Sequence, residues 1–189
     1  MTKKTRTIAK LAYSIETNKL HHLKVLNVSH NNLEFLPLEE LKNIQEVDCS
    51  WNNLSAMCLP RNSLVRVLRA SNNKFVNIMH SLCGNLPQKC LEYIDVSGNY
   101  VEDLILGNGL FDHNNTIVDY NSLNCEVFPR LAHLNCNNNY ICFISRLPHS
   151  LRELHLGNNN LTIDRLMAKH LAELCLLREL TISGNSINC

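Results

Sequence analysis

The segment from Leu151 to Leu161 reads LRELHLGNNNL. Apolar and polar residues alternate over Leu154-His155-Leu156, which is the period of a strand that buries one face. Asn159 follows three residues after this strand, and a further leucine closes the segment. The pattern predicts a short strand followed by a turn, in which the asparagine amide bonds to backbone groups that a turning chain leaves unpaired.

The same spacing of apolar residues and asparagine occurs eight times along the 189-residue chain. The copies begin at residues 23, 44, 65, 91, 113, 131, 151 and 177, and the copy at His113 is the weakest. A strand of one copy cannot bury its apolar face alone, so neighbouring copies are expected to stack into a parallel sheet with a continuous core. We expect the asparagines to form a buried ladder that consists of Asn31, Asn52, Asn73, Asn99, Asn121, Asn139, Asn159 and Asn185.

This LxxLxLxxNxL pattern resembles the leucine-rich repeat family. The resemblance implies an α/β solenoid of about eight repeats, a horseshoe with a concave parallel β-sheet and a mostly extended or 3₁₀ convex side. It covers residues 23–189, and residues 1–22 are expected to be an N-terminal cap or a degenerate repeat. Members of the family mostly bind proteins, so the resemblance also implies a protein partner.

Three segments depart from the regular pattern. Apolar residues at helical spacing over residues 162–176 predict a convex helix with Thr162 as a candidate N-cap. A shorter helix is expected over residues 76–83. Residues 102–112 contain Gly107 and Gly109, fit no position of the repeat, and are expected to protrude as a loop.

The composition limits the function classes. Lys and Arg number 18 against 17 Asp and Glu, and this balance gives no reason to expect a nucleic-acid partner. No apolar run approaches the roughly 18 residues of a membrane span, and no secretory signal is recognisable, so a cytoplasmic location is expected. Nine cysteines without a CxxC pair, two of them (Cys49 and Cys136) at core positions, favour reduced thiols over a disulfide framework.

The sequence contains no common catalytic motif, whether HExxH, GxSxG, GxxxxGK[ST] or GxGxxG. The nine histidines are scattered, whereas a zinc site needs convergent ligands. We therefore expect a non-catalytic interaction module without a metal or cofactor.

Strand periodicity places a set of polar and aromatic residues on the concave face. Trp51 is the only tryptophan and is expected to be exposed, as are Tyr93 and Tyr120. Tryptophan, tyrosine and arginine commonly anchor protein interfaces. The candidate binding residues are Trp51, Arg66, Arg69, Tyr93, Asp95, Asp48 and Tyr120. The alternative is that Asp48, Arg69 and Asp95 only pair among themselves across neighbouring strands.

Two other functions remain open at this point. The run Leu147-Pro148 followed by Leu151-Arg152-Glu153-Leu154 faintly resembles the PH-domain and leucine-rich-repeat protein phosphatases, and bacterial effector ligases share it. On that reading the chain is the substrate-targeting segment of a larger signalling enzyme, a Ser/Thr protein phosphatase or a ubiquitin ligase. The uncapped last repeat, with Leu180 and Ile182, suits dimerisation or a further domain there.

The remaining alternative is an extracellular receptor fragment. It rests on four Asn-x-Ser/Thr sequons at Asn27, Asn53, Asn114 and Asn160. The core positions of Cys49 and Cys136 oppose it, and nine free thiols on the denatured chain would exclude it.

Overall fold

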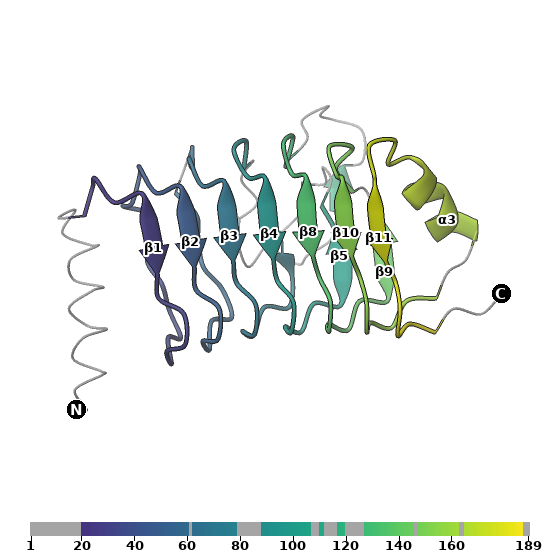
Figure 1. Cartoon of the computed structure of the whole chain (residues 1–189), viewed down its shortest axis with the longest axis horizontal. Helices are drawn as coiled ribbons and strands as arrows, with labels where there is room; N and C mark the ends of the chain where they lie inside the picture. Colours follow the sequence, from purple (N-terminus) through teal and green to yellow (C-terminus); the bar gives the residue numbers. More distant parts are fainter. Residues whose placement is uncertain are drawn as a thin grey trace.

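A computed structural model describes residues 20–60, 62–78, 88–106, 110–111, 117–119, 127–145, 147–162 and 165–186. Seven three-residue strands form one parallel sheet, in the order β1 (Val25–Asn27), β2 (Glu46–Asp48), β3 (Val67–Arg69), β4 (Tyr93–Asp95), β8 (His133–Asn135), β10 (Glu153–His155) and β11 (Glu179–Thr181). The strands follow one another along the long axis of the molecule (Figure 1). The predicted solenoid fold with a parallel sheet is confirmed.

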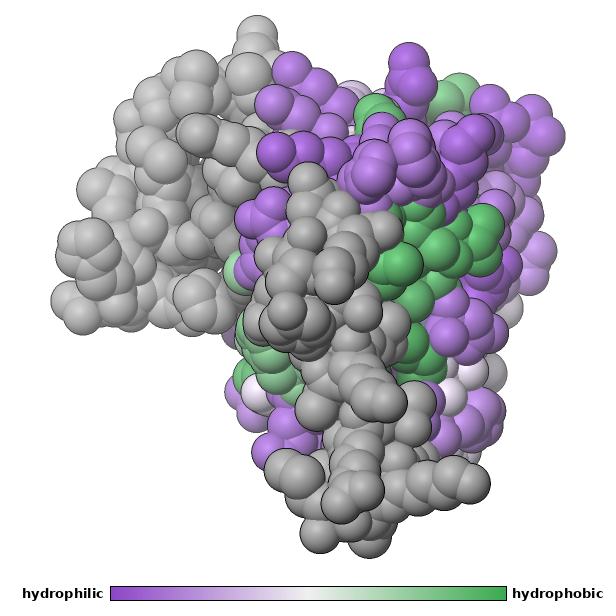
Figure 2. Space-filling model, turned by 90° about the vertical axis from the view of Figure 1, so that its left-hand side faces the viewer, coloured by the Kyte–Doolittle hydropathy of each residue, from purple (hydrophilic) through white to green (hydrophobic). Residues whose placement is uncertain are grey.

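The core lies behind this sheet and extends along its length. The central residue of each of its strands except β11 is buried there, and these residues lie side by side in register, as Leu68 does between Val47 and Ile94. All three are fully buried. At the end of the solenoid that begins with β1, hydrophobic side chains lie between hydrophilic margins (Figure 2). Aliphatic residues therefore supply most of the burial, with Phe75 and Phe128 as the largest buried side chains.

The predicted asparagine ladder is present in every described repeat after the first. The Nδ2 of Asn52 donates to the carbonyl of Cys49 at 2.9 Å and to that of Val28, one repeat earlier, at 3.0 Å. Its Oδ1 accepts from the backbone N–H of Leu33 at 2.9 Å. The same three bonds recur at Asn73, Asn99, Asn139, Asn159 and Asn185. Each amide thus joins two repeats, whereas Asn121 lies outside the described residues.

The repeat assigned at residue 113 does not contribute a strand to the main sheet. Its strand, β7 (Ile117–Asp119), pairs antiparallel with β6 (Leu110–Phe111). Strand β4 pairs directly with β8, so Asp95 is the partner of Asn135. The expectation that the repeat starting at His113 stacks between these two strands is therefore wrong. The physical reason is that His113 and Thr116 occupy positions that the sheet would bury, and burying unpaired polar groups is costly.

Residues 103–105 do not protrude as expected. They form β5 (Asp103–Ile105), which pairs in parallel with β9 (Phe143–Ser145) in a small second sheet. Leu104 and Leu106 are buried in the common core. The sequence feature that indicates this pair of strands is a shared apolar spacing. Val101 and Leu104 are three residues apart, and Ile141 and Ile144 have the same spacing in the partner segment.

The predicted convex helix is present but shorter than expected. Helix α3 (Arg165–Ala172) lies against β9 and buries Met167. The chain turns after Ala172, where the N–H of Leu174 donates to the carbonyl of Leu171. This turn is needed because β11 begins only seven residues later, at Glu179. The candidate N-cap Thr162 lies outside the helix, while residues 79–83 of the second expected helix and residues 1–19 lie outside the described ranges.

The ladder generates a stability prediction for Asn139, which spans the insertion between β4 and β8. Its amide bonds to Val96 and Cys136 and accepts from Val101. Asn139→Ala leaves these buried groups unpaired, so we expect it to lower the free energy of unfolding by about 3 kcal/mol. Asn160→Ala, at an exposed position, is the control and should change it by less than about 0.5 kcal/mol. Urea denaturation measures both, and equal effects would refute the role of the ladder.

Two core cysteines generate a pH prediction. Burial, and to a smaller extent the charge of Asp48, raises the pKa of the Cys49 thiol to about 12. Burial likewise raises the pKa of Cys136, with Asp95 contributing less. The folded chain therefore holds both protons above the pH at which the unfolded thiols ionise, so stability falls as the pH rises beyond about 9.

We expect the two thiols together to lower the free energy of unfolding by about 3 kcal/mol between pH 8 and pH 10. The double variant Cys49→Ala/Cys136→Val uses residues that the chain itself carries at equivalent core positions, Ala70 and Val96. It should lose that part of the pH dependence in urea denaturation. A variant whose stability falls with pH as steeply as that of the parent would show that the thiols are not protected.

Candidate functional site

The solvent-facing side of the seven-stranded sheet, here called the open sheet face, is the surface that the sequence predicted to be concave. Each strand presents its first and third residues there. The first row consists of Val25, Glu46, Val67, Tyr93, His133, Glu153 and Glu179, and the second of Asn27, Asp48, Arg69, Asp95, Asn135, His155 and Thr181. Residues of one row are lateral neighbours on adjacent strands.

Four residues of the second row also close the end of their strand. The Oδ1 of Asp48 accepts from the backbone N–H of Ser50 at 3.1 Å, and that of Asp95 from Ser97 at 2.9 Å. Asn27 and Asn135 make the same bond. Each aspartate thus uses one carboxylate oxygen to accept a backbone hydrogen bond in its own turn, and asparagine makes the same bond.

The turn that follows each strand has a left-handed residue. In the turns after the seven strands of this sheet, the residues with positive φ are His30, Trp51, Asn72, Gly98, Asn138, Asn158 and Gly184. Glycine adopts this conformation freely, and asparagine and histidine adopt it more readily than bulky residues do. Neighbouring positions fit closely, since a Cβ on Gly98 would lie 2.6 Å from Oδ1 of Asn72. Trp51, with φ at 58°, is the exception in this column.

Trp51 is exposed, as predicted, although it lies in the turn after β2 rather than on the strand. Its side chain is 54% exposed. The indole stacks on the His30 ring of the preceding repeat, with centroids 5.5 Å apart and planes 11° apart. A large aromatic surface is therefore held in a fixed orientation at the margin of the open sheet face.

Arg69 and Tyr93 come together in the middle of the face. The Cζ of Arg69 lies 5.5 Å from the centroid of the Tyr93 ring, a cation–π contact. Partial burial, and next the negative charge of Asp95, raises the pKa of the Tyr93 phenol. Arg69 lies between Asp48 and Asp95 in register but forms no ion pair with either described carboxylate. The alternative of a self-paired Asp–Arg–Asp ladder is therefore wrong.

Arg66 lies at the opposite margin of the sheet, before β3, and has its own partner. Its guanidinium donates to the Glu92 carboxylate through Nε at 3.1 Å and through a terminal nitrogen at 2.9 Å. This bidentate bond lowers the pKa of Glu92. Both side chains are solvent-exposed, so the pair contributes little to stability. Arg66 is thus separated from the predicted cluster and already paired.

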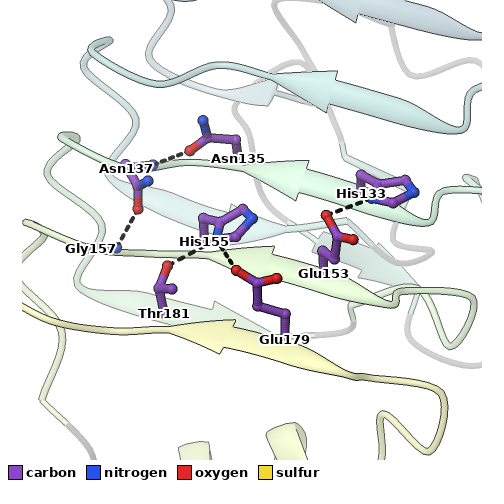
Figure 3. Close-up of polar contacts among 8 residues, drawn as sticks. All are labelled: His133, Asn135, Asn137, Glu153, His155, Gly157, Glu179 and Thr181. Atoms are coloured by element: carbon purple, nitrogen blue, oxygen red, sulfur yellow. Dashed lines mark hydrogen bonds and ion pairs between the residues drawn. The ribbon is translucent and has the colours of Figure 1, made fainter.

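Histidine–carboxylate pairs join the strands nearer the C-terminal end of the sheet (Figure 3). The Nδ1 of His133 lies 2.8 Å from a Glu153 carboxylate oxygen, and His133 also lies beside the Tyr93 ring at 6.2 Å. His155 contacts Thr181 at 3.0 Å and Glu179 at 3.9 Å. These residues were not in the predicted set, although strand periodicity placed them on this face.

Of the predicted site, the structure brings together Arg69 and Tyr93, flanked by Asp48 and Asp95. Trp51 lies at one margin, Arg66 at the other, and Tyr120 outside the described residues. A separate exposed pair, Tyr100 and Tyr140, stacks at 6.0 Å on the flank of the solenoid and was missed because it lies outside the strands.

Two further searches concern the described residues only. Within them, no cluster of three or more His, Cys, Asp or Glu side chains is arranged to hold a metal ion. No described helix is long and apolar enough to cross a membrane.

Comparison with known structures supports the fold. An internalin from Listeria monocytogenes is 20% identical, with a TM-score of 0.66 over 92% of this chain and 45% of the internalin. The leucine-rich-repeat domain of FLRT2, in an octameric complex with Latrophilin 3 and Unc5D, is 21% identical, with a TM-score of 0.60 over 87% of this chain and 47% of FLRT2. TLR13, in complex with ssRNA13, is 20% identical, with a TM-score of 0.67 over 92% of this chain and 23% of TLR13. The chain spans less than half the length of each.

The parallel sheet with one short strand per repeat and a ladder of buried asparagines defines a solenoid repeat protein. The leucine rich repeat family model matches residues 22–44 and 150–170. Two repeats of the chain thus match this family model, and the chain has the leucine-rich-repeat fold. No curated protein shows significant sequence similarity to it.

The left-handed position of Trp51 generates a prediction about stability. Asparagine occupies the equivalent position in three described repeats, at Asn72, Asn138 and Asn158. Trp51→Asn removes a strain of roughly 1–2 kcal/mol and an aromatic stack of about 0.5–1 kcal/mol. We therefore expect the free energy of unfolding to stay level or rise by up to about 1 kcal/mol in urea denaturation. Val25→Asn, which removes an exposed apolar residue from a strand, is the control and should bring no gain. A loss above about 1 kcal/mol in Trp51→Asn would mean that Trp51 serves packing.

Proposed function

We propose that this chain is a non-catalytic protein–protein interaction module that binds a protein partner through the open sheet face. The observation that supports this most is Trp51. The chain keeps a large, half-exposed indole at a left-handed position that asparagine or glycine fills in five other repeats. Residues held in strained backbone conformations are concentrated at functional sites.

The neighbouring residues suit a binding surface. Arg69 and Tyr93 hold each other in place, and their strands are fixed by the parallel sheet behind them. Such a preorganised surface loses little conformational entropy on association. Among proteins of the same fold, the FLRT2 domain is found in a complex with other proteins, and this supports a protein partner here.

A reducing, cytoplasmic setting belongs to the same proposal. All six described cysteines are free, and two of them, Cys49 and Cys136, lie in the core. Free buried thiols are ordinary in intracellular proteins, whereas secreted domains tend to use their cysteines for disulfides.

The proposal is tested by affinity capture from cell lysate with mass-spectrometric identification. The double variant Trp51→Asn/Arg69→Ala should lose a partner that the parent chain retains, because both changes remove anchor side chains without disturbing the core. The matched control, Phe35→Asn/Arg165→Ala, removes an exposed aromatic residue outside the strands and an exposed arginine on helix α3, which lies against β9, a strand outside the seven-stranded sheet. A partner retained by the first variant and lost by the control would place the binding site elsewhere.

A further inference from the structure

The two halves of the open sheet face differ in how their polar side chains are paired. From β3 to β11, side chains on neighbouring strands contact one another, through Arg69 and Tyr93, His133 and Glu153, and His155 and Glu179. On β2, by contrast, Glu46 forms no ion pair within the described part of the chain, and Asp48 bonds only to backbone. Strand β2 therefore presents two carboxylates that form no ion pair with any described residue, although the charge of Arg66, which is paired with Glu92, acts on Glu46 from the margin of the sheet.

The same strand leads directly into Trp51. Glu46 and Asp48 alternate with the buried Val47 and Cys49, and Trp51 lies in the turn, three residues after Asp48. His30 stacks on the indole, yet Trp51 remains 54% exposed, so part of the aromatic surface is available to a ligand. An exposed aromatic side chain in the turn after a strand that carries two carboxylates suits cationic side chains, above all guanidinium groups.

The charges on the open sheet face also favour a cationic ligand. Of the fourteen side chains that the seven described strands present, five are carboxylates and one is a guanidinium, although the whole chain carries a net charge of only +1. The single guanidinium, Arg69, already lies over an aromatic ring. Complementarity therefore favours a partner segment with several positive charges.

We infer that the partner binds this face with a basic, extended segment, one arginine of which lies on Trp51 next to Glu46 and Asp48. The inference rests on the proposed function and specifies the chemistry of the partner. Six strand spacings of about 4.8 Å correspond to roughly 29 Å across the sheet, or about nine residues of extended chain. A nine-residue peptide is therefore long enough to cross the whole face.

The test uses fluorescein-labelled nine-residue peptides of alternating serine with arginine, lysine or glutamate, and measures binding to the full chain by fluorescence anisotropy. We expect the arginine peptide to bind best, with an affinity that decreases as salt is added. Glu46→Gln/Asp48→Asn should weaken binding about tenfold. This variant should fold, because Asn27 and Asn135 show that asparagine makes the same turn bond as Asp48. The control Glu39→Gln/Glu40→Gln removes two exposed charges elsewhere and should change affinity less than about twofold.

Trp51 supplies an independent readout. Since it is the only tryptophan, its fluorescence should change when the arginine peptide binds. Trp51→Asn should abolish the preference for arginine over lysine, because that preference depends on stacking rather than on charge alone. Three results would overturn the inference. The glutamate peptide could bind as tightly as the arginine peptide, or the control variant could lose as much affinity as Glu46→Gln/Asp48→Asn. The third result is a change in Trp51 fluorescence with oligouridine but not with the arginine peptide.

The outcome can be separated from that of the proposed function. A lysate partner that depends on Trp51, combined with no binding of the arginine peptide, would refute the basic segment and leave the interaction module intact. If the Trp51→Asn/Arg69→Ala variant retained every partner of the parent chain, the proposed function itself would be refuted.

Discussion

Each described repeat after the first depends on the side-chain amide of one asparagine at the turn. The turn after each strand leaves backbone carbonyls and an N–H group that the sheet cannot pair, and they lie where water does not reach. An asparagine amide offers a two-proton donor and an acceptor on one rigid plane. Asn52 thereby joins Val28, Cys49 and Leu33, which belong to two repeats. The spacing between repeats is consequently set by hydrogen bonds as well as by the packing of leucines.

This dependence explains how the fold tolerates the insertion between β4 and β8. Asn139 bonds to Val96 and Val101 across separations of 43 and 38 residues, with the same geometry that Asn73 uses across 24 and 19. The entropic cost of closing a longer loop rises only slowly with its length. Once the ladder is restored, the next repeat stacks as if the insertion were absent, and the rows of the open sheet face remain continuous.

How far the sequence predicted the structure follows from the same physics. The seven strands and their ladder were predictable, because burial and hydrogen bonding fix both the strand period and the asparagine position. The strand Ile117–Asp119 was wrongly assigned to the main sheet because the spacing of the repeat continues through this segment. At two positions that the sheet would bury, the segment has the polar residues His113 and Thr116, which are costly to bury. The second sheet of β5 and β9 was missed because its residues lie outside the repeated pattern that identifies the main strands.

The candidate site was predicted less completely than the fold, for a related reason. Strand periodicity states which side chains face solvent, and it placed Arg69, Tyr93 and Asp95 correctly on one face. It does not state which rotamer a long side chain adopts, so it did not distinguish Arg69, which contacts Tyr93, from Arg66, which pairs with Glu92. Nor does it report backbone conformation in the turns, and the left-handed φ of Trp51 emerged only from the structure.

The distribution of paired and unpaired groups decides where on this face binding is favourable. A side chain that already has a partner, such as Glu153 with His133, must give up that contact or share it before it can serve a ligand. Glu46 and the second oxygen of Asp48 form no ion pair or side-chain hydrogen bond with the described residues, so a cation in good geometry can bind them without displacing such a partner. The indole of Trp51 adds apolar area at the same place and is already oriented by His30. Aromatic surface, free carboxylates and preorganisation therefore coincide at β2 and its turn, whereas the strands toward β11 offer polar groups that are largely engaged with one another.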